Sequence, residues 1–217
     1  MTEQGYLRKT LFALEVLDAV TLARVSQGLK VVAEGLQHRP YVNASGLFVW
    51  LKEDRAPLRR ITVDPGALPY QRVAIPAAEV DPRLTTIELS PGLNYPFARG
   101  ITGLRGTLVE SRTTRVPVSD AEVHLRWLDE DGTTWREAPT RSRTTSHGDF
   151  VTIARLAPTQ VPRVDANGAL TVRLRARLGT GERGSADLRL LQGRVADPST
   201  FPQGPDALTF AWDELQP

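Results

Sequence analysis

The strongest constraint on the fold of this chain is an internal repeat. Residues 16–33 contain an apolar run that ends in an acid, a polar connection with a threonine, a valine, a turn and a second apolar run. Residues 108–125 repeat these features in the same order. Further along, residues 45–49 (Ser-Gly-Leu-Phe-Val) are echoed by residues 146–151 (Ser-His-Gly-Asp-Phe-Val). A repeat at this spacing predicts two similar β-domains in tandem.

The remaining pattern is typical of an all-β protein. Short runs rich in Val, Leu and Thr are bounded by Gly, Pro, Asn and Asp, which predicts a β-sandwich architecture. Strands are expected at residues 10–18, 29–35, 46–52, 59–64, 84–89, 102–110, 121–128, 134–145, 149–156, 169–178, 185–193 and 207–212. Residues 179–184 are glycine-rich, so we expect a flexible hairpin loop there.

A boundary between the two domains is expected near residue 91. Residues 90–97 (Ser-Pro-Gly-Leu-Asn-Tyr-Pro-Phe) interrupt the strand pattern with two prolines and a glycine. We therefore expect an N-terminal domain at 1–91, a linker at 92–100 and a C-terminal domain at 101–217. Tyr95 and Phe97 are expected to pack between the domains rather than to bind a ligand, because interdomain segments commonly bury aromatic side chains.

The composition argues against several classes of protein. The 217 residues include no cysteine, which excludes disulfides, thiolate metal sites and cysteine nucleophiles. The net charge of +2 provides no strong field for nucleic acid. No apolar run is long enough to predict a transmembrane helix, and the apolar stretch 11–22 is broken by acids, so no signal peptide is expected. We expect synthesis in the bacterial cytoplasm and, for work outside the cell, exit by lysis or by a route that needs no signal peptide. A virion or injection particle is the expected location in that case.

Motifs that carry chemistry are missing from the sequence. The three histidines are scattered, and none has the spacing of a metal site, so structural or solvated roles are expected for them. There is no Gly-x-Ser-x-Gly elbow and no phosphate-binding loop. The acidic segment 129–132 lacks the closing glutamate of an EF-hand and reads as a hairpin tip. We expect no catalytic, cofactor-binding or metal site, and no enzyme activity.

The sharpest surface feature is a stripe of arginines. Arg173, Arg175 and Arg177 alternate with apolar residues, which places them on one face of a strand. Acids such as Glu122 and Asp187 are expected to pair with them across strands. A solvated or salt-bridged face is favoured first and a protein interface second. Nucleic acid comes third, because no exposed aromatic residues are interleaved. With Trp135, the tryptophan least committed to a core, these arginines form the candidate interface.

The C-terminal part resembles a known family. A glycine-containing strand at 103–109 precedes the segment 116–123 (Val-Pro-Val-Ser-Asp-Ala-Glu-Val) and then 144–150 (Thr-Thr-Ser-His-Gly-Asp-Phe). This order resembles the carboxypeptidase regulatory-like domain, with its pattern Pro-x-x-x-Ala-x-Val and then Thr-x-x-x-Gly-x-Phe. The loop at 111–115 departs from the tighter turn of that family. The resemblance implies a non-catalytic, transthyretin-like sandwich, and with the repeat it implies two tandem immunoglobulin/transthyretin-like β-sandwich domains.

The whole chain also looks like bacterial proteins found with contractile phage-tail-like particles. The shared features are a D-x-x-T element at 18–21, an S-G-x-F-V strand at 45–49 and a Y-P-F linker at 95–97. This resemblance implies a structural or accessory component of a phage tail or contractile injection system.

The first hypothesis is therefore a non-enzymatic structural protein that binds other subunits of a multi-component particle, with self-association as a further possibility. Nucleic acid binding and membrane insertion are not expected. The alternative is a carbohydrate- or cell-surface-binding adhesin module, which would expose two or three tryptophans in a row. A third hypothesis is an enzyme accessory domain, which would need a separate catalytic chain.

Overall fold

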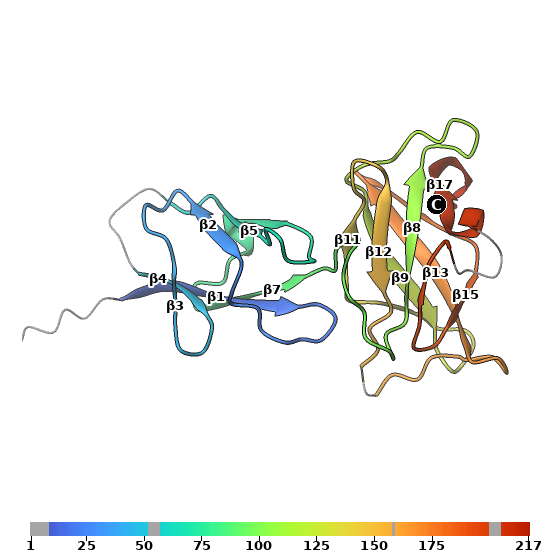
Figure 1. Cartoon of the computed structure of the whole chain (residues 1–217), viewed down its shortest axis with the longest axis horizontal. Coiled ribbons are helices and arrows are strands. Elements are labelled where there is room, and N and C mark those ends of the chain that lie inside the picture. The colour runs from blue at the N-terminus through green and yellow to red at the C-terminus, as the bar shows by residue number, and fades with distance from the viewer. Residues whose placement is uncertain (1–8, 52–56, 158, 200–204) are drawn as a thin grey trace, which may run out of the picture. The chain divides into compact units, whose positions relative to one another are not determined.

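The computed structural model describes residues 9–51, 57–157, 159–199 and 205–217, and within these ranges the chain is all-β (Figure 1). The all-β prediction is therefore confirmed. The chain divides into two compact units, Met1–Leu89 and Ser90–Pro217. Each unit has its own hydrophobic core, to which more than one sheet contributes, and this arrangement is consistent with a β-sandwich. Within the described ranges, no helix has the length and apolar character needed to span a membrane.

The first unit contains two sheets. One has the strand order β3 (Tyr41–Val42), β4 (Phe48–Leu51), β1 (Thr10–Asp18) and β7 (Leu84–Leu89), with β7 parallel to β1. The other has the order β2 (Lys30–Glu34), β5 (Arg60–Asp64) and β6 (Val73–Pro76), followed by the short 3-10 helix η1 (Ala77–Glu79). In Figure 1, β2 and β5 lie in a layer apart from β1, β3 and β4. Phe12 and Trp50 stack between the layers with ring centroids 4.6 Å apart.

The second unit is built on a six-stranded and a four-stranded sheet. The larger contains β10 (Trp135–Glu137), β9 (Glu122–Leu128), β13 (Ala169–Leu178) and β14 (Gly181–Gly184), with β11 (Ser142–Arg143) on β9 and β15 (Leu188–Leu191) on β13. The smaller contains β12 (Asp149–Ile153), β8 (Gly103–Val109), β16 (Val195–Ala196) and β17 (Thr209–Ala211). The 3-10 helices η2 (Pro205–Leu208) and η3 (Trp212–Glu214) flank β17. The core between the sheets includes Trp127, Phe150 and Leu174, all fully buried.

The strand pairings repeat between the units. In the first, β1 pairs antiparallel with β4 and parallel with β7. In the second, β8 pairs antiparallel with β12 and parallel with β17. The other sheets share the order β2-β5-β6 and β9-β13-β15, antiparallel throughout. The sequence repeat therefore corresponds to a repeat of pairing, with β2 in the place of β9.

The connecting loops repeat as well. The loops after β1 and β8 each contain a non-glycine residue with positive φ, Leu22 (59°) and Arg115 (52°). Each turn before β4 and β12 is held by one polar side chain that accepts two backbone hydrogen bonds. Asn43 accepts from the amides of Ser45 and Leu47, and Thr145 accepts from those of His147 and Asp149. The glycines at these turns, Gly46 and Gly148, both have φ of 78°.

Several strand predictions need correction. The strand expected at 134–145 is broken into β10 and β11, because Pro139 between them has no N–H to donate to the ladder. The expected flexible loop at 179–184 is wrong for Gly181–Gly184, which form β14 and pair with the end of β13. The short strands β3, β6 and β16 were not predicted, since two to four residues carry too little alternation to be recognised.

The aromatic residues of the predicted linker 92–100 form a small cluster in the second unit. Tyr95 is buried, and its ring centroid lies 4.8 Å from that of Phe97. Arg105 of β8 donates to the carbonyl oxygen of Tyr95 (3.1 Å) and lies over the Phe97 ring, 5.3 Å from its centroid. The cluster anchors the first residues of this unit to β8.

Candidate interaction surfaces

The arginine stripe lies along β13, and every member pairs with an acid of its own sheet face. The pairs are Arg173 with Asp187 (2.6 Å), Arg175 with Glu182 (3.0 Å) and Arg177 with Glu122 (2.9 Å). The expected partners Glu122 and Asp187 are thus confirmed. Exposed pairs of this kind contribute at most about 1 kcal/mol each, so they order the face more than they stabilise the fold.

The ion pairs continue across the neighbouring strands. Glu122 also lies 3.7 Å from Arg141, which donates to Glu137 at 2.9 Å. Glu137 lies 3.9 Å from Arg126. The arginine face is therefore an ordered mosaic of both charges rather than a basic platform.

Trp135 is brought together with one arginine of the stripe. The guanidinium of Arg173 lies 4.1 Å from the centroid of the Trp135 ring, and the indole is half-buried. Arg175 and Arg177 lie further along β13 and pair with Glu182 and Glu122. Of the four candidate interface residues, the structure places Trp135 and Arg173 in direct contact, and the other two on the same strand.

His124 lies beneath this mosaic, and sequence reasoning missed its burial. It points from β9 to the arginine face but is only 6% exposed, and neither ring nitrogen has a hydrogen-bond partner. Burial, with a smaller contribution from the charge of Arg141, lowers the pKa of His124 to about 4. The sequence signal was its position between Glu122 and Arg126, where long charged side chains from neighbouring strands cover a shorter one.

The tryptophans do not form an exposed row in the described ranges. Trp50 and Trp127 are buried, at 1% and 0% exposure. Trp212 is half-buried under Arg183, whose guanidinium lies 5.1 Å from a ring centroid. Together with the covered Trp135, these positions give no support to the adhesin alternative.

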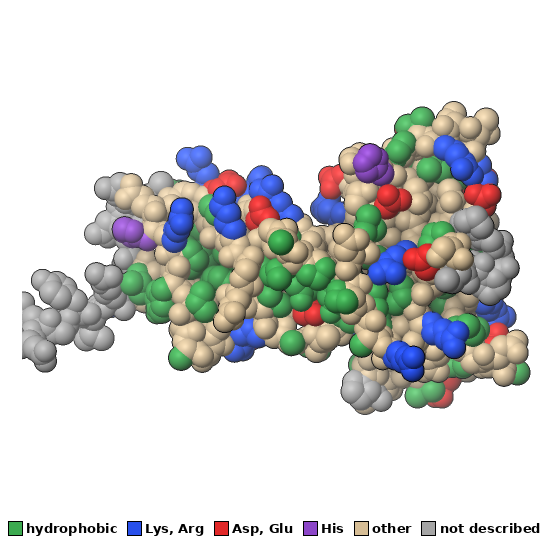
Figure 2. Space-filling view, in the orientation of Figure 1, with side chains coloured by type: hydrophobic (Ala, Val, Ile, Leu, Met, Phe, Trp, Pro, Cys, Tyr) green, Lys and Arg blue, Asp and Glu red, His purple; other side chains and the backbone are tan. Residues whose placement is uncertain are grey.

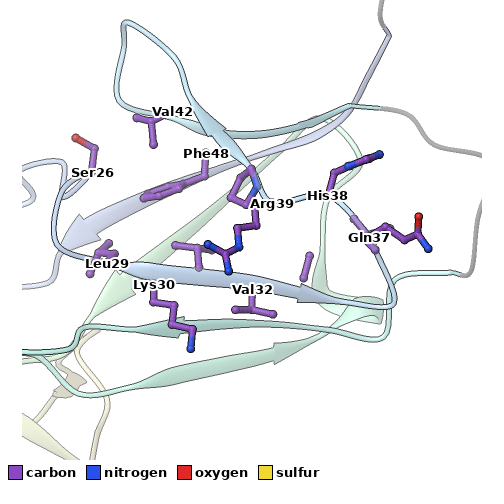
Figure 3. Close-up of a pocket in the computed structure, with 13 residues that line it drawn as sticks. Ser26, Leu29, Lys30, Val32, Gln37, His38, Arg39, Val42 and Phe48 are labelled. Carbon is purple, nitrogen blue, oxygen red and sulfur yellow. The ribbon is translucent and has the colours of Figure 1, made fainter.

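A different surface, which the sequence did not indicate, is a groove of about 570 Å³ in the first unit. Figure 3 shows it between β2 and the segment that leads through Arg39 to Val42 and Phe48. Its apolar lining is bordered by Lys30, His38 and Arg39, and no acid is among the lining residues. In Figure 2, hydrophobic side chains gather in a band across the first unit, near a row of basic ones.

The groove follows an open sheet edge. Among the described residues, β2 pairs with β5 on one side and with no strand on the other, and β3 pairs with β4 alone. Val32, Tyr41 and Val42 on these two strands are 41%, 48% and 48% exposed. An unpaired edge flanked by exposed apolar side chains is a template for pairing with another chain.

The corresponding edge in the second unit is covered. β13 pairs with one side of β9, so β10 and β11 must lie on the other. There the carbonyl of Leu125 accepts from the amide of Ala138, and that of Ala121 accepts from the amide of Thr144. The difference follows from the connections. Residues 129–144 are long enough to run back along β9, whereas the shorter segment 35–42 passes to β4 and leaves β2 bare.

Asp18, in the D-x-x-T element, is buried and holds two segments of the first unit together through its carboxylate. It is 5% exposed, and its carboxylate accepts from the amide of Val20 (2.7 Å) and from the Tyr70 hydroxyl (3.2 Å). Burial and the adjacent Asp18 raise the pKa of Tyr70 to about 12. The carboxylate therefore ties the loop after β1 to the segment before β6.

Replacing Asp18 by alanine is expected to lower the free energy of unfolding of the first unit by about 2 kcal/mol, because the buried amide of Val20 and the part-buried hydroxyl of Tyr70 lose their acceptor. Asp18→Asn, which keeps one acceptor oxygen, is expected to cost about half as much. Urea denaturation of both variants measures the difference. Equal losses for the two variants would show that the side-chain oxygen is not what holds the loop.

Comparisons with known proteins assign no family. No family model matches the chain, and no curated protein is similar to it. Among solved structures, a Streptococcal ancillary pilin is similar over 91% of this chain and 66% of its own length, with 13% sequence identity and a TM-score of 0.26. The chain thus spans just under two thirds of that structure. In the described ranges, no three His, Cys, Asp or Glu side chains gather in a group that would hold a metal ion.

Proposed function

We propose that this chain is a non-enzymatic structural or accessory protein that acts through protein–protein contacts. The observation that carries the proposal is the open edge of β2, with exposed Val32 beside an apolar groove, in a unit whose counterpart covers the same edge. Proteins usually protect such edges, so one left bare is best explained by a protein that covers it. In this proposal the two units are tandem immunoglobulin/transthyretin-like sandwiches, supported by their repeated strand pairing.

The proposed setting is a contractile phage-tail-like particle. It rests on the resemblance carried by residues 18–21, 45–49 and 95–97. Affinity purification of the tagged chain from its native host, with mass spectrometry and negative-stain microscopy, tests it. Sheath, tube or baseplate proteins with visible particles are the expected result. Recovery of the chain without any other protein would count against the proposal.

The arginine face is the second surface in this proposal. Since Arg173, Arg175 and Arg177 are held in place by acids of their own sheet, a partner would meet an ordered pattern of charge. Arg175→Glu is expected to weaken assembly while changing the free energy of unfolding by about 1 kcal/mol or less. Recovery of the same partners in the same amounts would remove this face from the proposal.

A further inference from the structure

The bare edge of β2 is complementary to itself. We propose that β2 pairs antiparallel with β2 of a second copy of this chain, about a twofold axis at Val32, so that the β2-β5-β6 sheets of two copies become continuous. The inference rests on the proposed function in that it assigns one of the protein–protein contacts. The partner in this inference is a second copy of the chain. Three separate observations favour it: the outward backbone groups of β2, the charges along β2, and the pairing of the equivalent strand β9.

The backbone of β2 presents the groups that such a pairing needs. The backbone carbonyl of Glu34 accepts a hydrogen bond from the backbone amide of Arg59, on the β5 side of the strand. Because antiparallel strands alternate, Val31 and Ala33 then turn their N–H and C=O outward. In the ranges described, the outward groups of Val31 have no partner, while the carbonyl of Ala33 accepts from Leu36 (3.2 Å). A carbonyl oxygen accepts two hydrogen bonds, so the outward groups of Val31 and Ala33 match those of a second copy.

The charges of β2 select this register. The strand reads Lys-Val-Val-Ala-Glu, so antiparallel pairing centred on Val32 places Lys30 of each copy opposite Glu34 of the other. The twofold axis produces this pair twice. A register shifted by two residues loses both pairs, which makes the centred register the favoured one.

The second unit provides a template for the same pattern. On β9, Glu122 lies opposite Arg143 of β11, and Arg126 lies opposite Glu137 of β10. In the repeat, Lys30 occupies the place of Glu122, so the charges are inverted. A strand added to β2 therefore needs an acid opposite Lys30 and a base opposite Glu34. The sequence of β2 itself provides both.

The side chains around the edge fit the same arrangement. Val32, which is 41% exposed, would meet Val32 of the other copy in a non-hydrogen-bonded pair, where side chains approach most closely. The groove lining contains Lys30 and Arg39 and no acid, so it would receive the carboxylate of Glu34 from the other copy. Figure 3 shows Lys30 and Val32 on β2, at one wall of the groove, and Arg39 on the segment that forms the other wall.

Analytical ultracentrifugation of the purified full chain tests the inference. A monomer–dimer equilibrium is expected, with dimer accumulating below about 0.5 mM. Lys30→Glu and Glu34→Lys each place like charges opposite one another twice, and each is expected to weaken the dimer about tenfold at low salt. The double variant Lys30→Glu/Glu34→Lys restores opposite charges and is expected to restore the dimer. Val32→Asp, which brings two carboxylates together on the axis, is expected to abolish it.

The matched control is Arg72→Glu, an exposed charge reversal just before β6 at the other edge of the same sheet. It is expected to leave the dimer unchanged. Hydrogen exchange provides a second readout, because the outward amides of Val31 and Ala33 should exchange at least about tenfold more slowly at high protein concentration.

A chain that stays monomeric at about 0.5 mM would overturn the inference. So would a dimer that Val32→Asp leaves intact, or a double variant that stays as weak as the single ones. Recovery of other particle proteins by a strictly monomeric chain would sink this inference and leave the proposed function standing. A dimer at β2 that recovers no other particle protein would support this inference and count against the proposed function.

Discussion

Replacing Gly148 by alanine is expected to lower the free energy of unfolding of the second unit by about 3–4 kcal/mol. Gly148 has φ of 78°, a conformation that disfavours any side chain by about 1–2 kcal/mol. An added Cβ would also lie 2.3 Å from the carbonyl oxygen of Leu108 in β8. The Leu108 carbonyl belongs to the backbone, and the added Cβ is attached directly to the backbone as well, so no side-chain rotation can relieve the contact. The turn before β12 must therefore shift. Chemical denaturation measures the loss.

Two other glycines separate the causes of this effect. Gly168 has φ of 76° and open space around it, so Gly168→Ala is expected to cost only about 1 kcal/mol. Gly46, at the equivalent turn of the first unit, would place a Cβ 3.0 Å from the flexible side chain of Arg24, so an intermediate loss is expected. If Gly148→Ala costs no more than Gly168→Ala, the close approach to Leu108 is not what constrains this turn.

The second unit is expected to lose roughly 3 kcal/mol of stability as the pH falls from about 6.5 to about 4, because of His124. Its pKa in the folded protein is about 4, below the ordinary value of 6.5. Over this range the unfolded chain binds a proton at His124 that the folded chain does not bind. The contribution is therefore complete above pH 6.5 and is lost as the pH falls through the folded pKa.

The groups that face His124 set the size of this effect. Burial and Arg141 lower its pKa, whereas Glu137, Glu182 and Glu122 act in the opposite direction. His124→Leu removes the titrating group and is expected to flatten the pH dependence between about 6.5 and 4. His147→Leu, at an exposed histidine in the turn before β12, is the control for the loss of a histidine as such. A slope that survives in His124→Leu would assign the pH dependence to other groups.

The sequence predicted most of the strands because alternation is a local property. Leu14 and Val16 in β1, and Val123, Leu125 and Trp127 in β9, are buried as their period of two requires. The repeat also aligned Gly46 with Gly148, and the structure places both glycines in turns with the same φ. The arginine stripe also followed from alternation, because alternation determines which face of a strand a side chain occupies. Its acidic partners were predicted because side chains on one face of a sheet pair across neighbouring strands.

What surrounds a strand was decided by tertiary structure. The lowered pKa of His124 reflects its burial and the charge of Arg141 on another segment, neither of which the alternation within β9 indicates. The open edge depends on a difference between two copies of one repeat. The segment 129–144 returns along β9, whereas the shorter 35–42 joins β4, so that the edge of β2 away from β5 has no strand partner among the described residues. Local sequence determined the faces of the strands, because side-chain alternation acts over two residues. Which edges stay free was decided by contacts between segments far apart in the chain, whose pairing depends on the length and path of every connection.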